Sequence, residues 1–322
     1  MDDVKYAGKV TSNDWIYETR RGEPEYWRKR MLSLCREIIF LSMIDSPNVV
    51  KMEEVIKTKS NYYTVLDFCN GGSLQNFLNL HGRFPERFAI KCLQQIISGC
   101  SALYEVNVMH RDLKLDNILI NFPQQDLLAE ADLRTIDLDT EPFVVKIADL
   151  GYARELTTKV EGRATSFKGS PLMMAPEQLS TYWGRGSGYS HKIDVWAIGV
   201  IFYQMLTGMF MFCVDSQTKR KDAMSELYKK IKKGTWSWPT DITISLNTFD
   251  FLNKTMQHDP LLRPTWTEMR QHPIFKDTEA SMLNRIRLDI VFDQEPEDGL
   301  LFKDRQIFVN TKDPALYSRL YQ

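Results

Sequence analysis

The residue types that could do chemistry are concentrated in one short stretch, MHRDLKLDNILI, at residues 109–120. Its last three residues have the apolar character of a buried strand, yet five of the eight residues before them carry ionisable side chains. A charge buried at the edge of such a strand is costly unless it is paired or takes part in chemistry. The carboxylate of Asp112 and the amide of Asn117 therefore mark either an ordinary charged turn or a working site.

The composition describes a globular protein that is long enough for one large domain or two lobes. The chain has 322 residues, of which 43% are hydrophobic and 26% charged, and its net charge is −1 at pH 7. A net charge so close to zero gives no electrostatic argument for nucleic acid as the main partner. The basic clusters at 28–30 and 229–233 are therefore interpreted as solvated helix faces.

The cysteines and the first residues bear on the cellular compartment. The five cysteines are odd in number and show no C-x-x-C spacing, which argues against a disulfide framework or a zinc site and favours a reducing compartment. The opening MDDVKYAGKV lacks an apolar h-region, and no run approaches 18 apolar residues. We therefore expect a cytoplasmic protein without a membrane span.

Hydrophobic periodicity predicts a strand-rich first part and a helical second part. Residues 4–20 alternate in short polar and apolar runs, and residues 49–68 contain two strands joined by the polar turn KTKSN. Residues 25–43 carry apolar side chains at helical spacing. Further helices are predicted at 74–80, 86–107, 192–208, 222–233, 247–256 and 265–271. This order predicts an α+β fold with two lobes and a cleft between them.

Three segments are predicted to lie outside the regular elements. Residues 121–142 separate the strand-like runs NILI and VVKIAD and contain six acidic residues against one arginine, so we interpret them as a mobile surface loop. The stretch WGRGSG at 183–188 is also predicted to be a loop. Residues 276–322 carry apolar side chains at partly alternating spacing, and we expect this extension to pack on a lobe or to bind a partner.

Five motifs, in the right order, resemble those of eukaryotic protein kinases. His110-Arg111-Asp112 with Asn117 is similar to the catalytic loop. KIADLGYA at 146–153 resembles the DFG segment, with leucine in place of phenylalanine, and GSPLMMAPEQ at 169–178 resembles the end of an activation segment.

The two later motifs support the same resemblance. DVWAIGVIFYQMLTG at 194–208 is similar to the long buried helix beneath the catalytic loop. DPLLRPT at 259–265 supplies Arg263, which the resemblance implies is paired with Glu177. The implied fold has two lobes, with an incomplete, strand-rich N-terminal lobe at 1–67 and a larger helical C-terminal lobe at 68–275.

The resemblance implies ATP-dependent phosphorylation of serine or threonine hydroxyls on protein substrates. Phosphoryl transfer asks the protein mainly to position the reactants and to neutralise phosphate charge. Asp112 would orient the substrate hydroxyl and accept its proton, and Lys114 would steady the transferred phosphate. Asn117 and Asp149 would hold Mg²⁺, a hard cation that prefers oxygen ligands. His110 would be a packed structural residue and not a base.

Within the kinases, the chain is similar to the ULK family of autophagy-initiating kinases. The phrase LDFCNGGSL at 66–74, the acidic insert and the GSPLMMAPE segment carry this resemblance. It implies that the backbone of Asp67 and Cys69 binds the adenine of ATP, with Leu66 guarding the space behind it, and that regulatory protein partners exist. A small buried thiol is an alternative interpretation of Cys69 that is compatible with the first.

The first part of the chain departs from the kinase pattern. It contains no G-x-G-x-x-G-x-V loop, and VKYAGK at 4–9 resembles the strand that follows such a loop. Glu37 matches the helix glutamate that pairs with the third-strand lysine in this family. Counting back from Glu37 leads to IYETRR at 16–21, where Glu18 takes the lysine position and two arginines follow. We therefore expect this lysine to be missing.

Two explanations of these departures stay open. The chain is either an active kinase with a truncated or wrongly joined first part, or a pseudokinase that acts as a scaffold or allosteric partner. Asp112, Asn117 and Asp149 favour an enzyme, because a scaffold has no chemical need for all three. A missing lysine and glycine loop favour the pseudokinase and predict that Mg-ATP binds roughly a hundredfold more weakly. A small-molecule kinase is disfavoured by GSPLMMAPE, which forms the peptide-docking platform in protein kinases.

Two hydroxyls before the GSP segment are the expected sites of regulatory phosphorylation. Thr165 and Ser166 precede Gly169, and we favour Ser166 from its distance to that glycine in the ULK-like pattern. Arg111 could engage a phosphate there through charge-assisted hydrogen bonds. We expect mass spectrometry of the protein from its native source to find the modification, and a chain never modified at either residue would contradict it.

Overall fold

The computed structural model describes residues 4–12, 24–156, 170–182, 188–213, 220–234, 236, 238–276 and 285–287. Two compact units are distinguished within the chain. Unit 1 comprises Met1–His81 and Lys91–Arg163, and unit 2 comprises Gly82–Ile90 and Ala164–Gln322. The described parts of both units contain helices and strands, so the predicted α+β class is confirmed. No described helix is long and apolar enough to cross a membrane.

Unit 1 begins with a three-stranded antiparallel sheet in the order β1-β3-β2. Its strands are β1 (Tyr6–Ser12), β2 (Met52–Lys57) and β3 (Asn61–Asp67), and the last two form the predicted hairpin. Side chains alternate between the two faces of a strand. Along β1, residues 7, 9 and 11 are less exposed than residues 6, 8 and 10, and Lys9 lies opposite the buried Thr64 of β3. Lys9 is therefore on the more covered face of the sheet.

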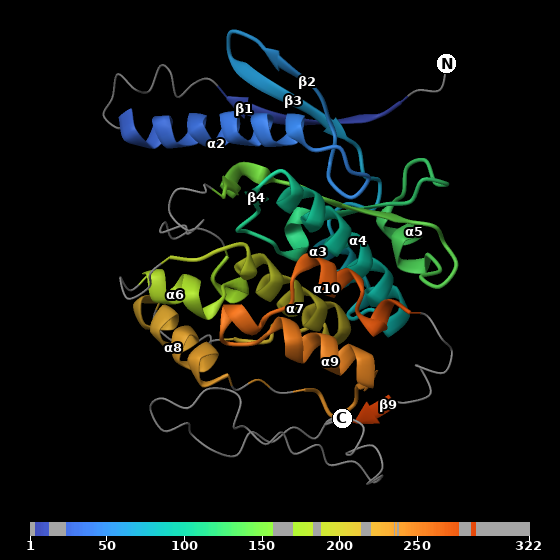
Figure 1. The fold of residues 1–322 in the computed structure, drawn as a ribbon. Coiled ribbons are helices and arrows are strands. Elements are labelled where there is room, and N and C mark those ends of the chain that lie inside the picture. Colours follow the sequence, from blue (N-terminus) through green and yellow to red (C-terminus); the bar gives the residue numbers. More distant parts are fainter. Residues whose placement is uncertain are drawn as a thin grey trace. The chain divides into compact units, whose positions relative to one another are not determined.

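Helix α2 (Pro24–Met43) runs along this sheet and contacts β2 (Figure 1). Its buried side chains recur at helical spacing, with Leu34, Glu37 and Leu41 on one face, whereas Ile39 and Met43 are exposed. Glu37 is only 4% exposed and so occupies a position where an apolar residue would be expected. A carboxylate buried in this way needs a charged or hydrogen-bonding partner.

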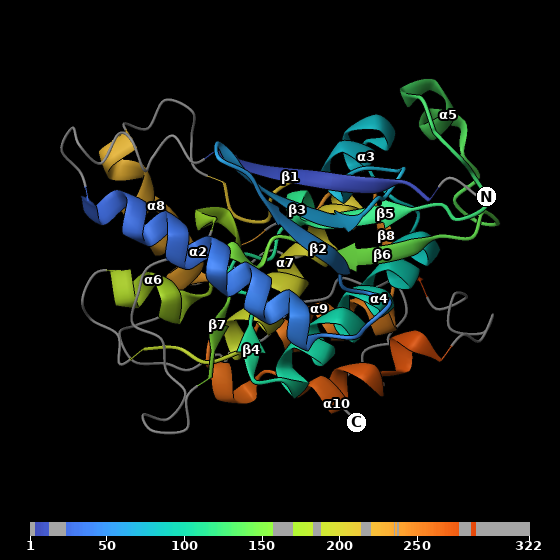
Figure 2. The same cartoon turned by 90° about the horizontal axis from the view of Figure 1, so that it is seen from above.

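The second sheet of unit 1 brings together the two segments that carry candidate site residues. Strands β5 (Ile118–Asn121) and β6 (Val144–Ile147) lie side by side (Figure 2) and pair antiparallel. The fully buried Ile118 and Ile147 are opposite each other in this pair. The 3₁₀ helix η2 (Leu115–Asn117) precedes β5, and η3 (Leu150–Tyr152) follows β6. The start of β5 and the end of β6 therefore place the catalytic-loop motif beside the DFG-like motif.

Helices and a short strand pair complete unit 1. They are α3 (Leu74–His81), α4 (Glu86–Glu105), whose first turn belongs to unit 2, and the pair β4 (Val108–Met109) with β7 (Arg154–Glu155). Gly99 of α4 lets the chain before β2 approach closely, since a Cβ there would lie 2.4 Å from the carbonyl oxygen of Asn48. The Asn48 amide in turn donates to the Val145 carbonyl at 2.9 Å. These contacts fix β6 on α4.

The acidic insert is not wholly the loop that its composition predicts. It contains helix α5 (Glu130–Thr135), whose first turn is capped by Asp132, which accepts from the backbone N–H of Ala129 at 2.8 Å. The amide of Asn70 donates to the Phe122 and Gln125 carbonyls at 2.9 and 2.8 Å. Acidic side chains at a helix N-terminus complement the helix dipole, which accounts for a helix within so acidic a segment.

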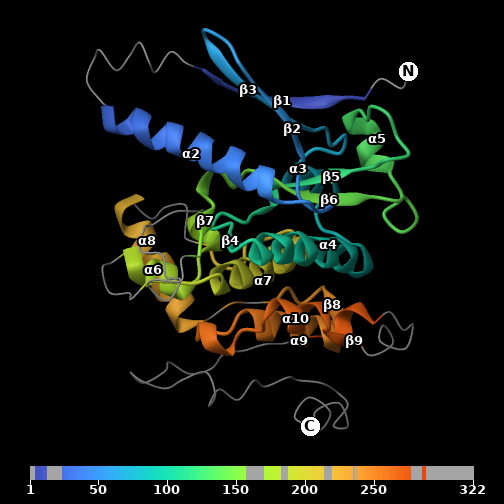
Figure 3. The ribbon, with the colours of Figure 1, turned by 45° about the horizontal axis from the view of Figure 1, so that its top comes forward.

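Unit 2 is built around α7 (Lys192–Thr207), which is buried at every position except its first residue. The prediction of a long buried helix is therefore confirmed. Helix α9 (Leu246–Thr255) packs on α7, and α6 (Pro176–Tyr182) contacts α8 (Arg220–Lys233) (Figure 3). The remaining elements are η5 (Pro171–Met173), η6 (Pro260–Leu262), α10 (Trp266–Arg270), η7 (Pro273–Phe275), β8 (Thr243–Ser245) and β9 (Arg285–Arg287).

The helix predictions are confirmed, and part of the C-terminal extension is placed. All seven predicted helices are present, and each end lies within two residues of the predicted one. Within the extension, Arg285–Arg287 form β9 and pair antiparallel with β8. The packing that we expected of this extension is thus seen for these three residues. Thr165, Ser166 and most of the loop at 183–188 lie outside the described residues.

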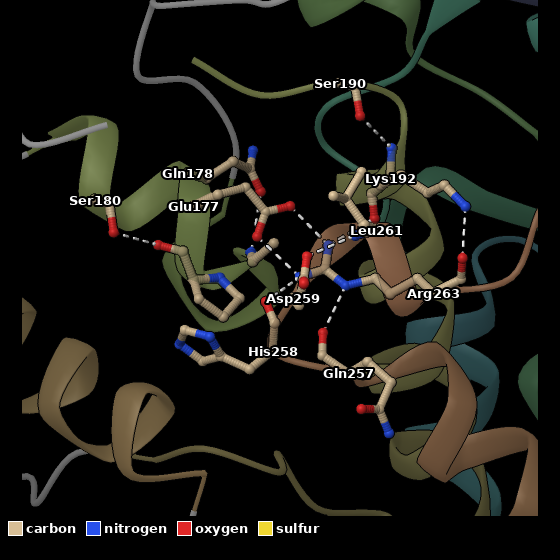
Figure 4. A network of polar contacts seen from close by, with 12 residues as sticks. Glu177, Gln178, Ser180, Ser190, Lys192, Gln257, His258, Asp259, Leu261 and Arg263 are labelled. Carbon is tan, nitrogen blue, oxygen red and sulfur yellow. Dashed lines mark hydrogen bonds and ion pairs between the residues drawn. The ribbon is translucent and has the colours of Figure 1, made fainter. Parts of the chain in front are cut away.

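Arg263 is the centre of a polar network inside unit 2 (Figure 4). Its side chain is fully buried, and its two Nη atoms donate to the two carboxylate oxygens of Glu177 at 2.7 and 2.8 Å. The other three N–H groups donate to the carbonyls of Gln257, Lys192 and His258. All five donors of the guanidinium are therefore satisfied. The pairing of Arg263 with Glu177 that the resemblance implies is confirmed.

Removing the carboxylate of this pair should destabilise unit 2 strongly. In Glu177→Ala the guanidinium of Arg263 stays buried without a counter-charge, and we expect the free energy of unfolding to fall by about 3 kcal/mol or more. Urea denaturation followed by circular dichroism measures the loss. The matched control is Asp241→Ala, which removes an exposed ion pair with Arg83 in the same unit and should cost less than about 1 kcal/mol. Equal losses in the two variants would contradict this account.

Candidate active site

An ammonium shared by two carboxylates lies at the centre of the candidate site in unit 1. Lys9 Nζ is 2.7 and 2.8 Å from the two carboxylate oxygens of Glu37, and 3.2 Å from Oδ1 of Asp149. The Glu37 side chain is 5% exposed, whereas those of Lys9 and Asp149 are 40% and 45% exposed. The lysine on the covered face of β1 thus supplies the partner that the buried Glu37 needs.

The expectation that the third-strand lysine is missing, with Glu18 in its place, is wrong. Lys9 contacts the predicted Glu37 across a separation of 28 residues, which is longer than the count back to Glu18 assumed. Glu18 itself lies outside the described residues. The sequence did contain a signal, because Ala7-Gly8-Lys9 has the A-x-K pattern of that strand.

Lys9 and Asp149 hold each other in their charged forms. Burial opposes the charge of Lys9, but the carboxylates of Glu37 and Asp149 outweigh it, so the pKa of Lys9 lies above its usual value. Burial likewise opposes the charge of Asp149, but Lys9 and the Gly151 N–H lower the pKa of that carboxyl below its usual value. The contribution of Lys9 to the stability of the fold is therefore lost only as the pH rises through its raised pKa. The contribution of Asp149 is lost only as the pH falls through its lowered pKa.

The backbone at Asp149 turns the chain so that neighbouring side chains point in different directions. Asp149 has φ 61° and ψ 73°, in the left-handed region, which aspartate tolerates better than most residues. The next residue, Leu150, is fully buried, while the Asp149 carboxylate reaches Lys9. Leucine thus takes the buried position that the resemblance assigns to the phenylalanine of DFG.

The structure brings Asp112 and Asn117 into contact. The Asn117 amide nitrogen donates to the carbonyl oxygen of Asp112 at 2.9 Å and to its carboxylate at 3.2 Å. Both side chains belong to residues that are less than 9% exposed. The amide therefore compensates part of the buried carboxylate's charge and fixes its orientation. The interpretation of this stretch as an ordinary charged surface turn is wrong.

His110 packs as a structural residue, as predicted. It is fully buried, its Nδ1 accepts from the Asp112 N–H at 3.2 Å, and its Nε2 lies 3.1 Å from the Ala148 carbonyl oxygen. Arg111 has φ 69° and donates from Nε to the Tyr152 carbonyl at 2.7 Å. These bonds attach the loop of Asp112 to the segment that carries Asp149.

Asn117 and Asp149 have the donor set for a magnesium ion that arrives with phosphate. The Ala148 N–H donates to the Asn117 carbonyl at 2.8 Å, so the two segments are joined next to Asp149. The side-chain oxygen of Asn117 accepts no hydrogen bond from a described residue. No cluster of three His, Cys, Asp or Glu that could hold a metal occurs among the described residues. One or two oxygen ligands suit Mg²⁺, which usually takes substrate phosphates as further ligands.

Lys114 lies two residues after Asp112, at the start of η2. Its backbone is extended, and its carbonyl accepts from the Asn117 N–H at 3.0 Å. The ammonium group makes no hydrogen bond or ion pair with a described residue. It is therefore available to an anion, and its role in steadying a phosphate stays a prediction.

The three residues predicted to form the adenine site lie at the end of β3, which contains Leu66 and Asp67, and just after it, at Cys69. The Asp67 carboxylate accepts from Lys146 Nζ at 2.7 Å and from the Lys51 N–H at 3.0 Å. Sequence reasoning missed Lys146, although this lysine stands three residues before Asp149 in the DFG-like motif. The ion pair joins the end of β3 to the strand that leads to Asp149.

Cys69 has a buried thiol and a backbone N–H group that is available as a hydrogen-bond donor. Burial raises the pKa of the Cys69 thiol to about 11, so it is protonated at neutral pH. The interpretation of Cys69 as a small buried thiol is confirmed, since the residue is 8% exposed. Its backbone N–H donates to no described residue, while its carbonyl accepts from the Gly72 N–H at 3.2 Å. A free N–H at this position is compatible with the predicted contact to a base, which stays a prediction.

Comparison with known proteins gives relatives over most of the chain. It is 33% identical over 264 residues to serine/threonine-protein kinase ATG1c of Arabidopsis thaliana, which is 82% of this chain and 32% of that protein. ATG1b of the same plant is 31% identical over 263 residues, covering 81% and 33%. Probable serine/threonine-protein kinase KCC4 of Saccharomyces cerevisiae is 34% identical over 243 residues, covering 75% and 20%. The chain spans about a third or less of the length of these curated relatives.

The ATG1 relatives are ULK-like kinases, so the resemblance to the ULK family is confirmed. The protein kinase domain family matches residues 6–275, a range that contains Lys9, Glu37, Asp112, Asn117 and Asp149. The geometry of the site and the extent of this match agree, and the chain belongs to the protein kinase domain family.

Proposed function

We propose that this domain transfers the γ-phosphate of ATP to serine and threonine hydroxyls of protein substrates. The observation that carries the proposal is the ion cluster in which Lys9 is held by Glu37 and Asp149. A fixed cation beside a carboxylate that can bind metal is what a bound triphosphate requires. The similarity to proteins named serine/threonine-protein kinases supports the choice of acceptor.

Each residue of the site has one task in this reaction. The backbone of Asp67 and Cys69 would bind adenine beside Leu66, Lys9 would bind the phosphates, and Asn117 and Asp149 would hold Mg²⁺. Mg²⁺, when bound, supplies positive charge that neutralises the phosphate oxygens.

The transfer itself is a displacement at phosphorus. The substrate hydroxyl oxygen forms a bond to the γ-phosphorus, the bond from that phosphorus to the bridging oxygen breaks, and ADP leaves. Asp112, oriented by Asn117, accepts the hydroxyl proton. Lys114 lies close in sequence to Asp112 and steadies the transferred phosphoryl group.

A pseudokinase that acts as a scaffold or allosteric partner is the alternative. Two sequence features favoured a pseudokinase. The first, a missing lysine, no longer applies because Lys9 pairs with Glu37. The second feature is that residues 1–322 contain no G-x-G-x-x-G motif. Folded residues 1–322 that transfer no phosphate from Mg-ATP would favour this alternative over the enzyme.

The cellular setting is part of the same proposal. All five cysteines are free thiols, which supports a reducing compartment such as the cytoplasm. The similarity to ATG1 kinases supports a role in autophagy, with protein substrates and regulatory protein partners.

Asp112→Asn should abolish most of the phosphate transfer while the fold persists. Loss of the proton acceptor lowers the rate by roughly 10²–10⁴, because asparagine keeps the shape but cannot take the proton. The assay follows transfer from Mg-ATP to a serine- or threonine-containing peptide by residues 1–322, with the melting temperature measured in parallel. Asp116→Asn, which changes an exposed carboxylate in the same loop, is the matched control and should leave the rate unchanged. Equal rates for wild type and Asp112→Asn would refute the assignment.

Lys9→Met should raise the KM for ATP. A charge-assisted contact contributes about 1.5–3 kcal/mol, so we expect a rise of roughly tenfold to a hundredfold. The KM is measured by the same transfer assay with ATP varied. Lys5→Met changes an exposed lysine on the approach to the same strand and is the control. Glu18→Gln tests the alternative alignment: a KM that responds to Glu18→Gln and not to Lys9→Met would restore it.

A further inference from the structure

Helix α2 is connected to the segment of Asp149 at two points, of which the first is the link from Glu37 through Lys9 of β1. The Ser33 hydroxyl donates to the carbonyl oxygen of Gly151 at 2.7 Å. Ser33 lies one helical turn before Glu37, and residues four apart share one face of a helix. The same face of α2 therefore holds the η3 segment twice, through the backbone of Gly151 and through the Glu37–Lys9–Asp149 cluster.

Both backbone polar groups of Gly151 are hydrogen-bonded to side chains. Its carbonyl accepts from Ser33, and its N–H donates to Oδ1 of Asp149 at 3.4 Å. A Cβ at this position would lie 3.0 Å from the Ser33 hydroxyl oxygen and 3.2 Å from Asp149 Oδ1. The absence of a side chain thus permits the close approach of Ser33 and Asp149 to the glycine.

The Asp149 backbone needs such support. Even for aspartate, the left-handed conformation is less favourable than the right-handed one, and contacts with the surroundings help to maintain it. The buried Leu150 anchors the segment from one side, and the Ser33 hydrogen bond anchors the next peptide group. Both anchors lie within two residues of Asp149, whose carboxylate contacts Lys9.

We propose that Ser33 is a positioning residue that keeps the Asp149 carboxylate oriented for its metal and phosphate partners. The coupling between Ser33 and the η3 backbone stands on geometry alone, whereas its effect on the reaction rests on the proposed function. Removing one hydrogen bond shifts an equilibrium roughly two- to tenfold. In Ser33→Ala, Asp149 should leave its position in the cluster more often by that factor.

The first readout does not require activity. Hydrogen–deuterium exchange of full-length protein, followed by mass spectrometry, reports the opening of residues 148–156. We expect exchange there to be roughly two- to tenfold faster in Ser33→Ala than in wild type, and close to wild type in Ser33→Thr, which keeps the hydroxyl. Alanine favours helix formation, so the variant should fold.

The matched control is Ser42→Ala in the same helix. The Ser42 hydroxyl is exposed and donates to the Ile39 carbonyl within α2, so its removal changes helix propensity without touching η3. Exchange at residues 148–156 should be unchanged in this variant. The second readout is the Mg²⁺ concentration that gives half the maximal rate, which should rise roughly two- to tenfold in Ser33→Ala at constant KM for the peptide.

The two proposals fail in distinguishable ways. Exchange that is the same in Ser33→Ala and wild type, equally fast in Ser33→Ala and Ser42→Ala, or equally fast in Ser33→Ala and Ser33→Thr would overturn the role of Ser33. A wild-type chain that transfers no phosphate would overturn the proposed function, and the exchange comparison would still decide the role of Ser33.

Discussion

The candidate site depends on one cation that two carboxylates share. Lys9 meets Glu37 across 28 residues of sequence and Asp149 across 140, so a strand, a helix and a 3₁₀ turn converge on a single ammonium group. Without that charge, the buried Glu37 and the left-handed Asp149 would leave two like charges close together. The positions of β1, α2 and η3 are thus tied to the same interaction that a nucleotide would use.

The Arg263–Glu177 pair and the Lys9–Asp149 pair differ in their capacity to bind a further ligand. Arg263 is enclosed, and each of its five N–H groups already has an acceptor, so this network can only stabilise unit 2. Lys9 and Asp149 are each more than a third exposed, and their contact, at 3.2 Å, is longer than the contacts of Lys9 to Glu37. An unsaturated pair of this kind can accept a further ligand, whereas a saturated one cannot.

Contiguous patterns in the sequence predicted most of the fold, and the lysine partner of Glu37 was the part of the site that was predicted wrongly. The helices and the Asp112–Asn117 stretch could be predicted because their signals lie within a few turns of the chain. The lysine was misplaced because periodicity does not determine the separation between a strand and the next helix, and the three residues Ala7-Gly8-Lys9 are a weak signal. Helix α5 was missed because its stability comes from a local cap and not from apolar spacing. Ser33 and Lys146 were missed because each contacts a partner that is more than 70 residues away in the sequence.

The two carboxylates that share Lys9 differ in solvent exposure: Glu37 is buried, whereas Asp149 is accessible to water. Glu37 is almost completely buried, so separating it from Lys9 would leave a charge in a low-dielectric environment, at a cost of several kcal/mol. Asp149 is nearly half exposed, and water can replace the ammonium that it gives up. An anion entering the cluster would therefore compete with Asp149 for Lys9, while Glu37 keeps the lysine in place. The Asp149 carboxylate released in this way is then free to bind a cation, which is why the backbone that orients it must be held from the helix side.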